Sequence, residues 1–105
     1  MQESSIALCA ASAYEQKYYL NPDFDALPQS VKDELKIMCV LFTEDVGGVL
    51  TLYFDKNGEL NFELTAKEAD GWFDEIGSEL KIKEIQRTKK ELLESLELFY
   101  KVFAS

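Results

Sequence analysis

Two alternating runs on either side of Asn57-Gly58 constrain the fold of this 105-residue chain more than any other feature. Over residues 49 to 55 and 59 to 65, apolar and polar side chains alternate strictly, which is typical of β-strands with one buried face. Asn-Gly between such runs is a strong signal for a tight turn, because both residues tolerate positive φ. The sequence therefore predicts an antiparallel β-hairpin.

Helical periodicity predicts the two elements that precede the hairpin. A first helix is expected over residues 5 to 19, closed by the turn-forming pair Asn21-Pro22. A second helix is expected from Pro28, which suits a first helical turn, to about Asp45 before Gly47-Gly48. The helical spacing of the first helix rests on Ile6, Cys9, Ala10, Ala13, Tyr14 and Lys17. The second helix is apolar around much of its circumference, so we expect it at the centre of the fold.

The C-terminal third has a helical pattern from about Glu68 onward, and it allows two interpretations. One long helix could run to the end of the chain, with Ile76 and Leu80 opposite its later apolar stripe. Alternatively, Gly77 could end a helix and residues 79 to 85 could form a third strand, with a new helix capped near Thr88. We favour the long helix, because Glu, Lys, Leu and Gln dominate the segment.

Together these elements predict a single α+β domain over residues 1 to 105. Its expected order is two N-terminal helices, an antiparallel β-hairpin with a possible third strand, and a long C-terminal helix. The length is close to the commonest domain size, and the hydrophobic fraction of 47% is normal for a folded chain. The first residues resemble no signal peptide, and no apolar run approaches about 18 residues. We therefore expect a cytoplasmic protein without a membrane partner.

The charge of the chain is strongly negative and unevenly spread. The net charge is −9, from 20 acidic and 11 basic side chains. Sixteen of the acids lie in residues 1 to 80, whereas residues 81 to 105 carry six basic and four acidic side chains. Such a chain repels the phosphate backbone, so we expect no nucleic-acid partner. The basic run from Lys81 to Lys90 could form an anion-binding helix, but a solvated face that offsets the acids is the commoner explanation.

The residue types needed for several kinds of catalysis are missing. The chain has no His, which excludes Ser-His-Asp and Cys-His centres within it. The two cysteines, Cys9 and Cys39, lie far apart in apolar stretches, so they are expected to be buried free thiols. No complete set of zinc ligands can be assembled from them. The sequence therefore predicts a protein that is not an enzyme, with no catalytic residue, cofactor or metal.

Three pairs of residues are the candidates for contact with a partner. Glu44 and Asp45 follow an apolar helix, where acids oppose the helix dipole at a cost of about 0.3 to 1 kcal/mol each. They form either a solvated turn or a carboxylate site for a cation or a basic side chain. Tyr18 and Tyr19 end the first predicted helix and belong either to the edge of the core or to an interface. Ile76 and Leu80 would face across a dimer.

Three segments of the chain resemble a known group of proteins. They are the run Tyr14 to Tyr19, the run Ile37 to Val49 and the run Asp74 to Ser78. On these residues the chain resembles a family of short proteins of unknown function from clostridia and related Firmicutes. The resemblance implies a bacterial, cytoplasmic source, and it carries no activity, cofactor or site residue with it.

These observations favour a small non-catalytic module for protein interaction or regulation, acting as a homodimer. A two-stranded hairpin is marginal alone and exposes two edges, so a second copy could extend or cover it. The alternative is an immunity- or antitoxin-like inhibitor, whose acidic surface would cover a basic partner protein.

The charge distribution yields a first prediction. At physiological salt the protein should bind neither DNA nor RNA oligonucleotides, because the acids of residues 1 to 80 outweigh the local basic run. Electrophoretic mobility shift or filter binding measures this directly. Micromolar retention that weakens with added salt would show that the residues from Lys81 onward act as an independent anion site.

Overall fold

The computed structural model of the chain describes residues 5 to 104 and contains four strands and three α-helices. The elements in chain order are β1 Ile6–Ser12, β2 Lys17–Leu20, a 3-10 turn Pro22–Phe24, α1 Gln29–Val46, β3 Val49–Phe54, β4 Leu60–Thr65, α2 Glu75–Thr88 and α3 Lys90–Ala104. The strands form one antiparallel sheet in the order β2-β1-β3-β4. No helix in the described residues is long and apolar enough to cross a membrane.

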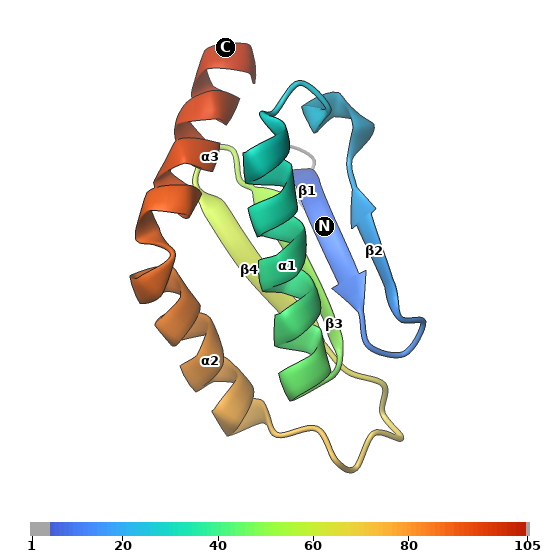
Figure 1. Cartoon of the computed structure of the whole chain (residues 1–105). Helices are drawn as coiled ribbons and strands as arrows, with labels where there is room; N and C mark the ends of the chain where they lie inside the picture. Colours follow the sequence, from blue (N-terminus) through green and yellow to red (C-terminus); the bar gives the residue numbers. More distant parts are fainter. Residues whose placement is uncertain (1–4, 105) are drawn as a thin grey trace.

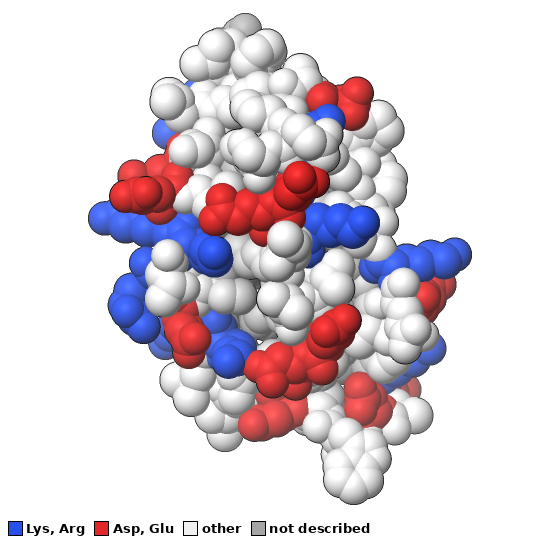
Figure 2. Space-filling view, in the orientation of Figure 1, with Lys and Arg blue, Asp and Glu red and all other residues white. Residues whose placement is uncertain are grey.

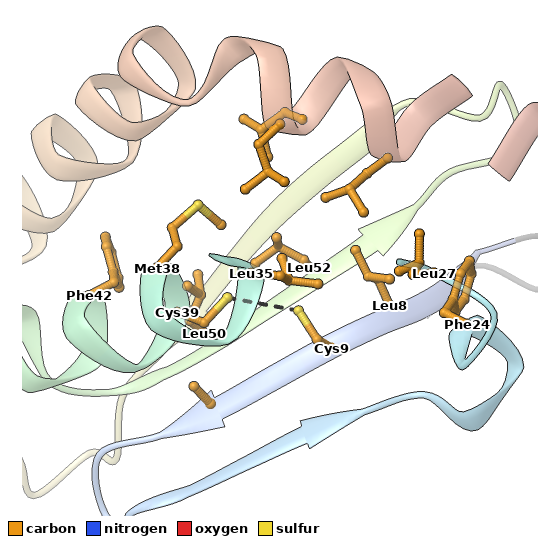
Figure 3. Packing of buried hydrophobic residues seen from close by; sticks show 14 of the residues in the cluster. Leu8, Cys9, Phe24, Leu27, Leu35, Met38, Cys39, Phe42, Leu50 and Leu52 are labelled. Carbon is orange, nitrogen blue, oxygen red and sulfur yellow. Dashed lines mark hydrogen bonds between the residues drawn. The ribbon is translucent and has the colours of Figure 1, made fainter. Parts of the chain in front are cut away.

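All three helices pack on the same face of the sheet (Figure 1). Helix α1 crosses the sheet centre, and α2 and α3 follow one another along the β4 side (Figure 1). The buried core therefore lies between the sheet and the helical layer (Figure 3). Its members are Leu8, Cys9, Ala11, Phe24, Leu27, Leu35, Met38, Cys39, Phe42, Leu50, Leu52, Phe54, Leu92, Leu93 and Leu96. The opposite sheet face has no helix against it.

The predicted hairpin is confirmed, with β3 and β4 paired from Val49 to Thr65. Its turn is set by Asp55 and Gly58: the Gly58 N–H donates to the Asp55 carbonyl at 2.9 Å, and Gly58 has a φ of 78°. The Asp55 carboxylate accepts from the backbone N–H groups of Asn57 and Glu59. A hydrogen bond from the Asn61 side chain is the main cause that lowers the pKa of Asp55. Alternation and turn chemistry agree here.

Helix α1 also agrees with the prediction, which began it at Pro28 and ended it near Asp45. Pro28 immediately precedes the first helical residue, where a missing N–H costs nothing. Gly47 ends the helix with a φ of 85° and donates its N–H to the Thr43 carbonyl. Phe24, just upstream, packs back onto the core and stacks on Phe54 at a ring distance of 5.6 Å.

The prediction of a helix over residues 5 to 19 is wrong, so the fold does not begin with two helices. This segment forms the hairpin of β1 and β2 instead. A β-bulge after Ala7 places Leu8 and Cys9 side by side in the core, followed by Ala11. Because Leu8, Cys9 and Ala11 are all buried, the apolar positions of β1 do not alternate strictly, and their spacing resembles that of an amphipathic helix. The turn that follows contains no Gly or Pro, and Gln16 adopts a φ of 53°.

The single long C-terminal helix is also wrong. Residues 66 to 74 form a loop, and two helices follow it, separated at Lys89. Residues 79 to 85 are helical, so they do not form the possible third strand. The additional strands of the sheet come from β1 and β2 instead. The break at Lys89 is mild, because its N–H still donates to the Ile85 carbonyl and its carbonyl accepts from Leu93. The bend lets both helices follow the sheet (Figure 1).

The link between α1 and β3 yields a second prediction. Gly48 has a φ of 76°, and a Cβ added there would lie 2.7 Å from the Thr65 carbonyl oxygen and 3.0 Å from the Phe73 ring. Gly48→Ala should therefore lower the free energy of unfolding by about 2 kcal/mol or more. Urea unfolding measures it, with Gly71→Ala as the matched control, because nothing lies within 4 Å of that Cβ position. Equal effects of the two substitutions would contradict the close approach.

Candidate functional site

A groove lies beside a free edge of the sheet, between β4 and α2, and the loop of residues 66 to 74 closes one end of it. Its volume is about 610 Å³, within the range of sites for small ligands and peptide side chains. The β4–α2 groove is lined by Phe62, Leu64, Ala66, Lys67, Glu68, Asp70, Phe73, Glu75, Ser78, Glu79 and Ile82. Apolar side chains from three elements form part of the wall, and acids surround it.

Tyr14, in the β1–β2 turn, holds the loop that closes this groove. Its hydroxyl donates to Asp70 Oδ2 at 2.7 Å and accepts from the Lys67 backbone N–H at 3.0 Å. The Lys67 ammonium lies 4.6 Å from the centre of the Tyr14 ring. The hydrogen bond to Asp70 is the main cause that raises the pKa of Tyr14 above its ordinary value. The Tyr14 side chain thus contacts both Lys67 and Asp70 of the loop.

Two further contacts place α2 on the far side of the groove. The Phe73 ring lies against Gly48, at the start of β3. Asp74 then caps α2, because its side chain accepts from the Gly77 N–H at 3.1 Å. The buried Ser78 hydroxyl donates to the Glu75 carbonyl, so it is satisfied within the helix.

Glu44 and Asp45 do not form one carboxylate site. Asp45 points toward α2 and pairs with the Lys81 ammonium at 3.2 Å, which raises the pKa of Lys81. Glu44 lies on the other side of α1 and lines a second cavity of about 680 Å³ with Lys36 and Tyr18. The two side chains separate because consecutive helical residues differ by 100° in direction.

The basic run from Lys81 to Lys90 is used mainly against the protein's own acids. Besides the contact to Asp45, Lys89 pairs with Glu34 of α1 at 3.4 Å. Lys90 pairs with Glu94 one turn further along α3 at 3.8 Å. These pairs agree with the expected offset of the acidic remainder, and those of Lys81 and Lys89 join the middle and the C-terminal end of α2 to α1 rather than forming a common anion site.

Tyr18 and Tyr19 lie on opposite faces of β2, so they do not act together. Tyr19 is exposed on the sheet face that carries no helix, whereas Tyr18 points toward the core. The Tyr18 hydroxyl is buried and has no hydrogen-bond partner among the described residues. Burial, followed by the neighbouring thiols of Cys9 and Cys39, raises the pKa of Tyr18. Tyr18 lines the second cavity, while its hydroxyl lies near the thiols of Cys9 and Cys39.

Cys9 and Cys39 are buried free thiols, which confirms the prediction for them. Their sulfur atoms lie 3.8 Å apart, across the contact between β1 and α1 (Figure 3). The hydrogen bond from this contact and then burial raise the pKa of the Cys39 thiol, which keeps it protonated and unreactive. Within residues 5 to 104, no three side chains of His, Cys, Asp or Glu gather as a metal site would require.

Ile76 and Leu80 lie on the surface of α2 that faces away from the core, with exposed fractions of 75% and 63%. Trp72, just before this helix, is almost fully exposed. The phase difference seen in the sequence separates Ile76 and Leu80 from the buried stripe, as expected. The sequence analysis did not single out the groove residues Phe62 and Leu64, which are apolar positions of the alternating run over residues 59 to 65. Knowing which strand lies at the edge would have found them.

The Tyr14 contacts yield a third prediction. Tyr14→Phe removes two hydrogen bonds of the loop, so amide exchange over residues 66 to 74 should accelerate about tenfold, with little change in global stability. Tyr19→Phe is the matched control, because this side chain is exposed on the opposite face. Hydrogen exchange followed by mass spectrometry gives the comparison. Unchanged exchange in the loop would show that Tyr14 does not hold it.

Comparison with known proteins identifies the family of this chain but assigns no activity to it. Neither curated proteins nor solved structures contain a match to this chain. A family model described as a family of unknown function, DUF6145, matches residues 5 to 105, which is nearly the whole length. The chain therefore belongs to the DUF6145 family.

Proposed function

We propose that this domain is a non-catalytic protein-interaction module of the bacterial cytoplasm that acts as a homodimer. The observation that carries the proposal is a set of large apolar side chains, exposed on the outer surface of α1 and α2. They are Ile37, Leu41, Ile76 and Leu80, each between 58% and 75% exposed. Exposed apolar side chains gathered on one surface are typical of an interaction site, whereas scattered ones need no explanation.

These four residues share one surface, here called the helical surface. Helices α1 and α2 run side by side in opposite directions. Two ion pairs show this arrangement, since Asp45 near the end of α1 pairs with Lys81, and Glu34 near its start pairs with Lys89. On each helix the apolar pair is spaced by four residues and lies opposite the buried stripe. The two pairs therefore point the same way, away from the sheet.

The charges around the apolar pairs favour a second copy as the occupant. Asp33 and Glu44 flank the pair on α1, whereas Lys83, Glu84 and Arg87 follow the pair on α2. Figure 2 views this face and shows basic side chains toward the junction of α2 and α3, with acidic ones over α1. A two-fold arrangement can set Asp33 and Glu44 on the acidic α1 of each chain against Lys83 and Arg87 of the other.

This support differs from the argument based on sequence. A lone hairpin would have needed a partner strand, but the sheet already has four strands. The dimer proposal therefore rests on the helical surface alone. The alternative function, an inhibitor that covers a basic partner, is supported by the net charge of −9 and by the acids around the β4–α2 groove.

The fourth prediction concerns assembly. Light scattering at about 10 µM should report twice the chain mass of 12.0 kDa, because an interface of ordinary size is populated at this concentration. Leu80→Glu places a charge in the apolar centre of the helical surface and should give a folded monomer. Circular dichroism checks that the variant remains folded.

Leu98→Glu is the matched control, because Leu98 on α3 is 64% exposed, like Leu80, but lies outside the helical surface. This variant should remain a dimer. A wild-type monomer at the same concentration would contradict the proposal, and a monomeric Leu98→Glu variant would move the interface to α3.

A further inference from the structure

Strand β4 lies at the edge of the sheet with its free side toward the β4–α2 groove, and we propose that this groove binds an extended, basic segment of a partner protein. The segment adds to β4 as a fifth strand and inserts alternate side chains into the groove. This second binding site goes beyond self-association and does not depend on the helical surface.

The direction of the β4 backbone follows from the hairpin register. The Asp55 N–H donates to the Glu59 carbonyl at 2.9 Å, so this pair is hydrogen-bonded. Hydrogen-bonded pairs alternate along an antiparallel ladder, so the next ones are at Asn61 and Glu63 of β4. The backbone groups of Phe62 and Leu64 therefore point away from β3.

The first residue of β4 confirms this direction. The Leu60 N–H donates to the Glu97 carboxylate of α3 at 2.7 Å, on the side away from β3. Beyond this contact, β4 pairs only with β3 in the part of the chain that the structure describes. Phe62 and Leu64 consequently offer two N–H donors and two carbonyl acceptors to a further strand, in the spacing that an extended chain presents.

The same two residues supply side chains to the groove. Phe62 and Leu64 lie on the helix side of the sheet and are only partly buried, together with Ile82 of α2. With Phe73 they form an apolar wall in a cavity of about 610 Å³. A strand added to β4 has every second side chain on this side, so each inserted side chain meets apolar surface.

The charges around the groove determine whether the bound segment of the partner should be basic or acidic. Asp70 and Lys67 are engaged by Tyr14, which leaves Glu68, Glu75 and Glu79 at the rim. A segment with Lys or Arg at positions near α2 is attracted to these carboxylates, whereas an acidic one is repelled.

The same charges argue against a second copy in this site. Two β4 edges brought together would place acidic rims against each other, in chains that each carry −9. Like charges on two paired strands repel each other, so they oppose this pairing of two β4 edges.

The test uses the eight-residue peptide Thr-Val-Thr-Lys-Thr-Val-Thr-Lys as the probe, in which Val and Lys share the face that enters the groove, with the full-length protein labelled for nuclear magnetic resonance. In the free protein, the amides of Phe62 and Leu64 should exchange quickly with solvent, while that of Glu63, bonded to β3, should exchange slowly. Addition of the peptide should slow exchange at Phe62 and Leu64 at least fivefold and show saturable binding below about 1 mM.

Two matched controls separate the backbone contribution from the charge contribution. The same peptide methylated on alternate backbone nitrogens lacks the donors for β4 and should lose binding at least tenfold. The double variant Glu75→Gln with Glu79→Gln should weaken the unmodified peptide about three- to tenfold, as expected for two partly screened charges. Glu91→Gln with Glu94→Gln removes the same charge from α3, outside the groove, and should leave binding unchanged.

Several outcomes would overturn the proposal. No binding at 1 mM, equal binding of the peptide with Glu in place of both Lys residues, or equal binding of the methylated peptide would each do so. Slow exchange at Phe62 and Leu64 that grows with protein concentration, without peptide, would show that a second copy occupies the edge.

Discussion

The pairing of β1 with β3 is the contact on which the rest of this structure depends. It joins residues about 40 positions apart and places both at the centre of the sheet. The bulge after Ala7 directs Leu8 and Cys9 together toward α1, which gives the central helix its main contact. Without this pairing, each hairpin would be an isolated two-stranded ribbon, which is marginal in water. The edge position of β4 also follows from it, because β1 occupies the other side of β3.

Local signals explain what could be predicted of the fold. The β3–β4 hairpin was predictable because alternation and the turn at Asn57-Gly58 are both contained in 17 consecutive residues. Helix α1 was predictable because Pro28 and Gly47 mark its ends. The β1–β2 hairpin was not, because the bulge disrupts alternation and its turn uses Gln16 at positive φ where Gly or Asn is usual. Tertiary pairing overrides the helical spacing there.

The candidate site was predictable only in part, for a similar reason. The exposure of Ile76 and Leu80 follows from their phase on one helix, and the separation of Glu44 from Asp45 follows from helical geometry. The open side of Phe62 and Leu64 instead depends on strand order, which is a non-local property. The proposed contact surfaces therefore differ in origin: the exposure of each apolar pair on the helical surface is encoded locally, whereas the β4–α2 groove arises from the assembled sheet.

The Tyr14 contact also has a consequence for the order in which the chain folds. It links residues 56 positions apart, which come near each other only when β1 has paired with β3 and β3 with β4, because Ser12 lies opposite Val49 and Val49 opposite Thr65. The loop of residues 66 to 74 can dock only on a β1–β2 turn that is already formed. Such late contacts contribute mainly to the unfolding rate, whereas contacts in the folding nucleus set the folding rate. We therefore expect this end of the groove to close after the sheet has formed, so that loss of the Tyr14 hydroxyl speeds its opening while the rate of folding stays the same.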